Sequence, residues 1–262
     1  KGVQALGLAS YVGGEMQGVN GTGVASVVAG DMWGVQSSGL ANVTGGTLNG
    51  LQAAGVVNVA RQVNGVQAAG VLNVAGEVNG MQMGVVNLSD QMNGMPLGLI
   101  NLSRNGGVQL SGWYSSLTEA NTGLRFRAGN FYTLFGFGLD ASDYGSVSKI
   151  EDTTETISNS LSFGATIPAG LLSFNVDAGV VSIDEEDFFE LNEEKDRWGM
   201  QCRGMLEFSL FGGLSTFGGA GAAYMVDATE DPTEKDIRNG EWEQFYFLGA
   251  GIEFGDRGKH ER

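Results

Sequence analysis

Cysteine, histidine and proline are scarce in this 262-residue sequence, which holds one, one and three of them. A single cysteine, Cys202, excludes an intrachain disulfide bond. The single histidine, His260, lies in the charged segment 256–262, so a Ser-His-Asp triad and a histidine-based metal site are excluded. No GxSxG, P-loop or dinucleotide-binding motif is present either. We therefore predict no enzymatic activity, no cofactor, and no catalytic, cofactor-binding or metal-binding residue.

Positive charge is also scarce, because 14 Lys and Arg residues face 30 Asp and Glu residues, a formal net charge of −16. This balance excludes nucleic acid as a partner, since phosphates need a basic surface. No apolar run of 18 residues occurs, which excludes a transmembrane helix and leaves a transmembrane β-barrel open. The sequence opens Lys-Gly-Val-Gln without an apolar leader, so we expect that an exported protein has already lost its signal peptide.

Glycine, in contrast, is abundant, with 44 residues, and hydrophobic residues make up 42% of the chain. Glycine costs roughly 1 kcal/mol per helical position relative to alanine, which disfavours helices. The hydrophobic fraction is too high for a disordered chain, and the G-X-Y period of collagen is missing. We predict an all-β protein.

Residues 1–106 repeat one short unit. Copies begin at 2 (GVQALGLAS), 18 (GVNGTGVAS), 34 (GVQSSGLAN), 50 (GLQAAGVVN), 65 (GVQAAGVLN), 80 (GMQMGVVN) and 94 (GMPLGLIN), and an eighth start, GVQL, stands at 107. Successive starts are 16, 16, 16, 15, 15, 14 and 13 residues apart. Each unit has two apolar, β-prone stretches with a glycine between them and a polar connector after them.

Two points of length variation decide how the unit folds. Two residues separate Gln67 from Gly70, whereas one separates Gln82 from Gly84. A one-residue change within a straight strand would turn every later side chain to the opposite face. The connector varies as well, so we predict a β-solenoid of about seven coils with glycines at its corners. The alternative is one wide barrel of about 14–16 strands that includes the repeats.

The predicted coils bring identical amides into register. We expect these rows to satisfy buried corner groups, and we favour this interpretation over a regular ligand-binding or ice-like lattice. The Asn-X-Ser/Thr triplets follow the repeat, so we interpret them as its by-products and not as glycosylation sites. The rows are Gln36, Gln52, Gln67 and Gln82, and Asn42, Asn58, Asn73, Asn87 and Asn101; the triplets begin at Asn42, Asn87 and Asn101.

Residues 107–255 carry longer strands of alternating polarity. In 197–210 every second residue from Trp198 to Leu210 is apolar or small, and Arg203 and Glu207 fall on the opposite face. Strand 170–183 alternates in the same way. We predict strands at 107–116, 122–129, 131–142, 160–168, 170–183, 197–210, 213–226 and 241–254.

Short and long connections alternate between these strands. Tight turns are predicted near Gly129-Asn130, Pro168-Ala169 and Gly212-Gly213, and long polar links at 143–159, 184–196 and 227–240. This alternation is typical of an antiparallel outer-membrane barrel, here of eight strands, with periplasmic turns and extracellular loops. The acidic link 184–196 offers oxygen ligands for calcium, but its spacing fits no calcium-binding loop, and we favour a solvated surface loop.

The two faces of these strands predict where the charges of the barrel lie. Arg125, Arg127, Arg203, Asp140, Asp177, Glu207 and Glu253 fall on the interior faces. Since an eight-stranded barrel has no open pore, we expect a charge-paired core. On the outside we expect apolar rows that fill the roughly 25 Å lipid band, with Trp198, Trp242 and Phe254 at its interfaces. Cys202 is interpreted as a small buried or lipid-facing hydrophobe.

One stretch carries a family resemblance. The run GMQMGVVNLSDQMNGMPLGLINLSRNGGVQLSGWYSS, followed by TGLRFRAGNFYTLFGFGLD, resembles poorly characterised bacterial surface-repeat proteins built on GLQLGLxN-type units. The resemblance covers most of the chain and implies an exported envelope protein, with no catalytic residues to transfer. The sequence departs from the usual outer-membrane barrel in the tail GDRGKHER, which follows the final aromatic Phe254.

The sequence thus predicts a Gly-rich repeat module at 1–106, a barrel at 107–255 and a charged tail at 256–262. The favoured function is a non-enzymatic structural or interaction protein of the bacterial outer membrane and cell surface. In this hypothesis a lipid-embedded barrel anchors a rigid repeat module, which contacts other envelope proteins or copies of itself. The alternative function is a wide outer-membrane channel or transporter, and a lipid-modifying barrel enzyme is a more distant one.

Overall fold

The computed structural model describes residues 1–140, 154–187, 195–227 and 240–255. The described residues form β-strands and contain no helix long and apolar enough to cross a membrane. Two compact units divide the chain: residues 1–107 with Phe126–Phe131, and Val108–Arg125 with Tyr132–Phe254. The predicted charged tail with His260 lies outside the described residues, as do the central parts of the three long links.

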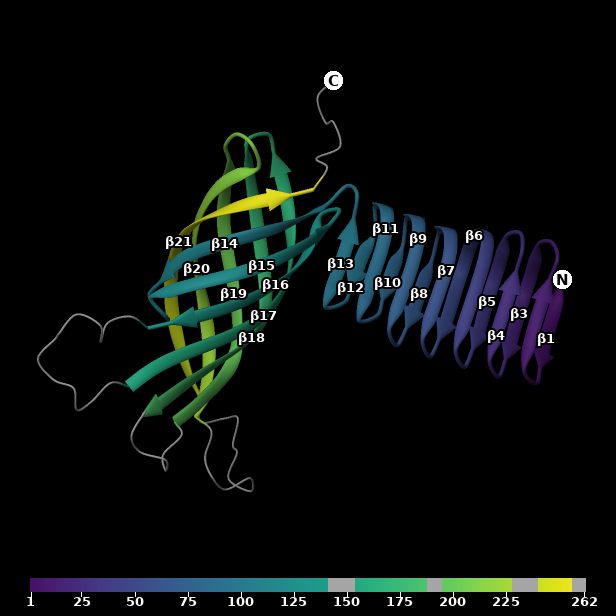
Figure 1. Cartoon of the computed structure of the whole chain (residues 1–262), viewed down its shortest axis with the longest axis horizontal. Coiled ribbons are helices and arrows are strands. Elements are labelled where there is room, and N and C mark those ends of the chain that lie inside the picture. The colour runs from purple at the N-terminus through teal and green to yellow at the C-terminus, as the bar shows by residue number, and fades with distance from the viewer. Residues whose placement is uncertain (141–153, 188–194, 228–239, 256–262) are drawn as a thin grey trace, which may run out of the picture. The chain divides into compact units, whose positions relative to one another are not determined.

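The first unit contains a β-solenoid, as the length variation of the repeats predicts (Figure 1). Each coil has two strands, and each strand pairs in parallel with its counterpart in the next coil, so that Gln67 lies between Gln52 and Gln82. The first strands are β1 (Gly2–Leu6), β3 (Met16–Thr22), β5 (Met32–Ser38), the second half of β6 (Ala41–Ala54), β8 (Val66–Ala69), β10 (Met81–Met83) and β12 (Met95–Leu97). The second strands are β2 (Ala9–Val12), β4 (Ala25–Val28), the first half of β6, β7 (Val57–Val63), β9 (Leu72–Val78), β11 (Val86–Met92) and β13 (Ile100–Ser103).

The chain turns between the two strands of a coil, at the glycine that the repeats share. Gly70 and Val71 lie between β8 and β9, so the segment after Gln67 has a corner and is not straight. The alternative of one wide barrel that includes the repeats is therefore wrong. That alternative fails because a continuous membrane strand cannot contain a corner at the glycine.

Two kinds of side chain fill the coils. Apolar residues that include Met32, Leu48 and Val63 form a stacked core, while buried amides fill the remainder. The predicted ladders are confirmed, because Gln67 donates to Gln52 at 2.8 Å and Asn58 donates to Asn73 at 3.1 Å. The other bonds of the two ladders join Gln52 to Gln36, Gln82 to Gln67, Asn42 to Asn58, Asn73 to Asn87 and Asn87 to Asn101.

The asparagine ladder also satisfies backbone carbonyls from within. Asn58 donates to the carbonyl oxygen of Ala68 at 2.7 Å, and Asn73 donates to that of Met83 at 2.7 Å. A buried polar group without a partner would cost roughly 1–3 kcal/mol, so the ladder stabilises the corner. Asn42, Asn87 and Asn101 of the Asn-X-Ser/Thr triplets are at most 1% exposed, which keeps them from acting as folded-state glycosylation sites.

Glycine is required where successive coils begin. Gly18, Gly34 and Gly50 have φ of 127°, 125° and 142°, a region that L-residues with a side chain rarely adopt. A Cβ on Gly50 would lie 2.0 Å from the carbonyl oxygen of Gly34 in the neighbouring coil. The stacking distance of the coils therefore depends on these glycines.

The second unit contains a closed barrel of eight strands, as predicted. The strands are β14 (Gly107–Ser115), β15 (Ala120–Ala128), β16 (Phe131–Leu139), β17 (Thr154–Ala169), β18 (Leu172–Asp187), β19 (Lys195–Ser209), β20 (Leu214–Asp227) and β21 (Glu241–Phe254). The last strand closes on the first through the antiparallel pairs from Val108–Phe254 to Ser115–Phe247.

Two details of the predicted barrel need correction. The tight turn predicted near Pro168-Ala169 lies slightly further along the chain, at Gly170 with φ of 71°, because Pro168 and Ala169 still pair within the β17–β18 ladder. Proline suggested the turn, but glycine supplies the left-handed conformation. Strands β17 and β18 also extend to Thr154 and Asp187, so residues 154–159 and 184–187 are strand and not link.

We predict that Gly50→Ala loosens the repeats and that Gly21→Ala does not. The first change places a Cβ against the neighbouring coil at a positive φ, which should cost roughly 2–4 kcal/mol. Gly21 has open space around the added Cβ. Hydrogen–deuterium exchange should be at least about 30-fold faster across residues 34–73 in Gly50→Ala alone, by about 1.4 kcal/mol per tenfold. Equal exchange in both variants would contradict the close stacking.

Candidate functional site

The interior of the barrel holds two buried ion pairs. Arg125 Nη1 lies 2.9 Å from Glu207 Oε2, and Arg203 Nε lies 2.8 Å from Asp177 Oδ1. The four side chains point inward from three strands, β15, β18 and β19, and are nearly inaccessible. The prediction of a charge-paired core is confirmed for these residues.

Neutral groups join the two ion pairs into one network. Tyr132 donates its hydroxyl to Asp177 Oδ2 at 2.9 Å, and its ring centroid lies 4.5 Å from the guanidinium carbon of Arg125. Glu207 also accepts from Gln109 at 2.9 Å and from Asn175 at 3.2 Å. Since two cations balance two anions, the network leaves no net charge on these four side chains.

Three further residues predicted in the interior are less enclosed. Arg127, Asp140 and Glu253 are only half-buried, and Arg127 belongs to the first compact unit. They lie at or near strand ends, where the sequence alternation continues but the barrel encloses the side chain only in part. The barrel therefore encloses these three residues only in part. Within the described residues, no cluster of three or more His, Cys, Asp or Glu could hold a metal ion.

The outer face of the barrel is apolar. Leu206 is 59% exposed, whereas Arg203 and Glu207 on the same strand are 7% and 9% exposed. Trp198, Met200 and Phe208 also face outward, so the predicted assignment of the two faces is confirmed. Cys202 is exposed on this outer face, next to Gly204 in the outward row.

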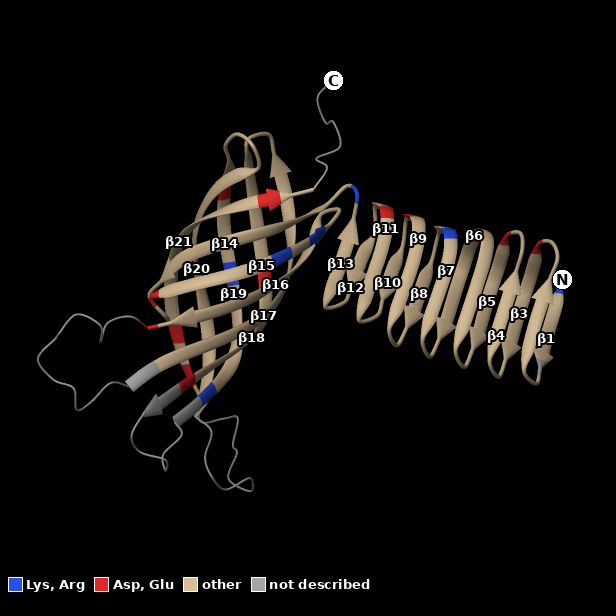
Figure 2. Ribbon diagram, viewed as in Figure 1, with Lys and Arg blue, Asp and Glu red and all other residues tan. Residues whose placement is uncertain are grey.

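The solenoid separates its side chains in a comparable way. Charged residues follow one edge, here called the charged edge, near the end of the second strand or just after it in six of the seven coils (Figure 2). Exposed aliphatic residues follow the opposite corner, here called the aliphatic edge. The charged edge comprises Glu15, Asp31, Arg61, Glu77, Asp90 and Arg104; the aliphatic edge comprises Leu8, Val24, Leu40, Val56, Val71, Val85 and Leu99.

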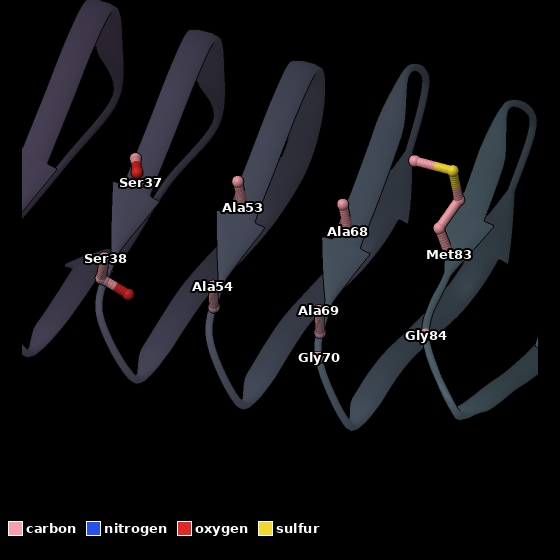
Figure 3. Close-up of a pocket in the computed structure, with 9 residues that line it drawn as sticks. All are labelled: Ser37, Ser38, Ala53, Ala54, Ala68, Ala69, Gly70, Met83 and Gly84. Carbon is pink, nitrogen blue, oxygen red and sulfur yellow. The ribbon is translucent and has the colours of Figure 1, made fainter. Parts of the chain in front are cut away.

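A shallow groove of about 500 Å³ runs across four coils beside the aliphatic edge (Figure 3). Ser37, Ala53, Ala68 and Met83 occupy the same register position in successive strands. Small side chains hollow the face at this point. The other lining residues are Ser38, Ala54, Ala69, Gly70 and Gly84.

Sequence reasoning did not identify the aliphatic edge. The signal was present, because the residue after the glycine at the corner of every unit is Leu or Val. A corner position is usually polar, since loops face water. The pattern becomes clear only in the structure, where the coils align these aliphatic residues along one corner and the charged residues along the other edge.

The sequence matches no family model and no curated protein. Solved structures similar to part of the fold include the N-terminal β-barrel domain of Pseudomonas aeruginosa OprF, with 14% identity, a TM-score of 0.42 and coverage of 57% of this chain and 99% of that one. A major outer membrane protein from Thermus thermophilus matches with 14% identity, a TM-score of 0.37 and coverage of 57% and 99%. Neisserial surface protein A matches with 8% identity, a TM-score of 0.34 and coverage of 56% and 92%.

We predict that Arg203→Leu destabilises the barrel by about 3–5 kcal/mol, because it leaves Asp177 as a buried charge without its cation. Arg197→Leu is the control, since Arg197 pairs with Glu243 at a partly exposed site and should cost at most about 1 kcal/mol. Urea unfolding of both variants in detergent micelles measures the difference. Similar midpoints for the two variants would show that the interior pair has no special role.

Proposed function

We propose that this protein is an integral outer-membrane protein, in which the barrel is the anchor and the repeats form a rigid module for contacts within the envelope. One observation carries the proposal: the barrel has charged, hydrogen-bonded side chains inside and apolar side chains outside. A soluble barrel needs the opposite arrangement. A lipid bilayer accommodates a barrel with an apolar outer face, because a closed barrel pairs its backbone groups between strands.

The outward row on the last strand is apolar except at Gln244 and is long enough to cross a bilayer. Trp242, Tyr246, Leu248, Ile252 and Phe254 all point outward from β21. Twelve residue steps from Trp242 to Phe254, at about 3.4 Å per step and a tilt of about 40°, correspond to roughly 30 Å along the barrel axis. Aromatic residues at the two ends of this row match the interfaces of the roughly 25 Å lipid band.

The filled interior favours an anchor over a channel. Paired side chains occupy the lumen, and eight strands enclose room for side chains but not for an aqueous path. The wide channel of the alternative hypothesis also required the repeats as membrane strands. A structural or interaction role without catalysis is the function that fits both units. The resemblance to bacterial surface-repeat proteins, and contacts of the module with envelope proteins or its own copies, remain predictions.

We predict that Leu206→Arg blocks assembly of the barrel into membranes. Arginine on the lipid face costs roughly 2–4 kcal/mol near the bilayer midplane and at most about 1 kcal/mol near the interface. Phe211→Arg, at a turn tip, is the matched control and should assemble. Folding of urea-denatured chain into phosphatidylcholine vesicles measures both. A wild-type chain that is monodisperse in buffer without detergent would refute the membrane proposal.

We also predict that the long links lie on the outer side of the membrane. Protease added to intact cells should cut within 184–196 or 227–240 and spare the tight turn at Gly212. Permeabilised cells provide the control, because the turn side then becomes accessible. Cutting at Gly212 alone in intact cells would show that the proposed orientation is wrong.

A further inference from the structure

We propose that the aliphatic edge of the solenoid inserts into the acyl-chain region of one bilayer leaflet, with the charged edge left in water. The partner of the repeat module is therefore a lipid surface. The inference rests on the proposed function, since the barrel brings the repeats to the bilayer. Only residues 104–106 separate β13 from β14, which keeps the repeats within reach of the same membrane.

The separation of charge from aliphatic residues holds along the whole module. The aliphatic edge carries Leu or Val in all seven coils, and Leu40 at its middle is 50% exposed. On both adjoining strands the outward positions next to this edge, such as Val66 and Val74, are also uncharged. The charged residues Arg61, Glu77 and Asp90 lie toward the other ends of β7, β9 and β11. The charges of the solenoid therefore gather toward the charged edge, as Figure 2 shows.

The backbone at the aliphatic edge is paired within the protein, which lipid immersion requires. The amide of Val56 donates to the carbonyl of Leu40 at 3.1 Å, and that of Val71 donates to Val56 at 3.2 Å. The buried asparagine ladder binds further carbonyls near this corner from the inside, as Asn58 does for Ala68. This edge therefore presents aliphatic side chains outward while its peptide groups bond to the next coil.

The dimensions of a coil fit one leaflet. Val56 on the aliphatic edge and Arg61 on the charged edge are five residues apart in extended chain, which at about 3.3 Å per residue is roughly 16 Å. Half of a hydrocarbon core of about 30 Å is roughly 15 Å. The groove along Ser37, Ala53, Ala68 and Met83 is lined mainly by small and apolar side chains, on which an acyl chain can lie.

A protein partner fits this surface less well. Protein interfaces bury one patch and mix apolar contacts with polar ones, with a polar rim. Here the polar groups lie at the charged edge, where a row of exposed asparagines runs from coil to coil. Asn64 donates to Asn49 at 3.2 Å, and Asn79 donates to Asn64 at 3.2 Å. The arrangement is that of an interfacial amphipathic element, with an apolar side for lipid and a polar side for water.

Lipid-borne quenchers test the inference on the full chain. In a Cys202→Ser background, single cysteines are placed by Val71→Cys and Leu40→Cys on the aliphatic edge, Asn64→Cys on the charged edge, and Leu248→Cys on the outer face of the barrel. Each is labelled with NBD and reconstituted in phosphatidylcholine vesicles. Nitroxide lipids probe contact with acyl chains, and iodide probes contact with water.

The nitroxide lipid should quench the labels at 71, 40 and 248 at least twofold, while the label at 64 should respond to iodide instead. Iodide quenching at 71 and 40 would overturn the inference and leave the barrel anchor intact if 248 is quenched by lipid. Protection of 71 and 40 from both quenchers would also overturn it, because a protein or a second copy would then cover the edge. Failure of lipid quenching at 248 would instead contradict the proposed function.

Discussion

Pairing of the peptide groups inside the protein is the constraint on which the remaining structure depends. A surface can present apolar side chains to lipid only where its N–H and C=O groups already have partners. The barrel meets this condition by closing β14 onto β21, which leaves no free strand edge among its eight described strands. The solenoid meets it by hydrogen bonds between successive coils, supplemented by the asparagine ladder.

Polar side chains consequently move inward in both units. The barrel interior holds Arg125, Asp177, Arg203 and Glu207 as two ion pairs, and the coils hold rows of glutamine and asparagine. In the coils the repeat itself satisfies most of these amides, because an identical residue lies one coil away. Asn42 has Ser26 on one side, and its Oδ1 has no hydrogen-bond partner among the described residues. The row stops where the repeat changes: Pro96 lies beside Gln82, and Gln82 Oε1 has no hydrogen-bond partner among the described residues.

Much of this arrangement could be predicted from the sequence because it follows from periodicity. The one-residue difference between Gln67–Gly70 and Gln82–Gly84, together with the variable connector, favoured coils over straight strands, and the alternation around Arg203 assigned both faces of the barrel. The turn at Gly170 was placed slightly too early in the sequence, because proline and glycine compete as turn signals. The aliphatic edge was missed because a corner becomes significant only when seven coils align it, and Arg127, Asp140 and Glu253 show that alternation alone does not reveal where the enclosure ends.

The central claim is that the outward residues of the barrel contact acyl chains while the inward charges remain enclosed by protein. Nuclear Overhauser measurements on the labelled chain in phosphatidylcholine nanodiscs test this most directly. We expect cross-peaks from lipid methylene protons to Leu206 and Leu248 and none to Arg203 or Glu207. Cross-peaks from water to Leu206 and Leu248, with no lipid contact, would contradict it.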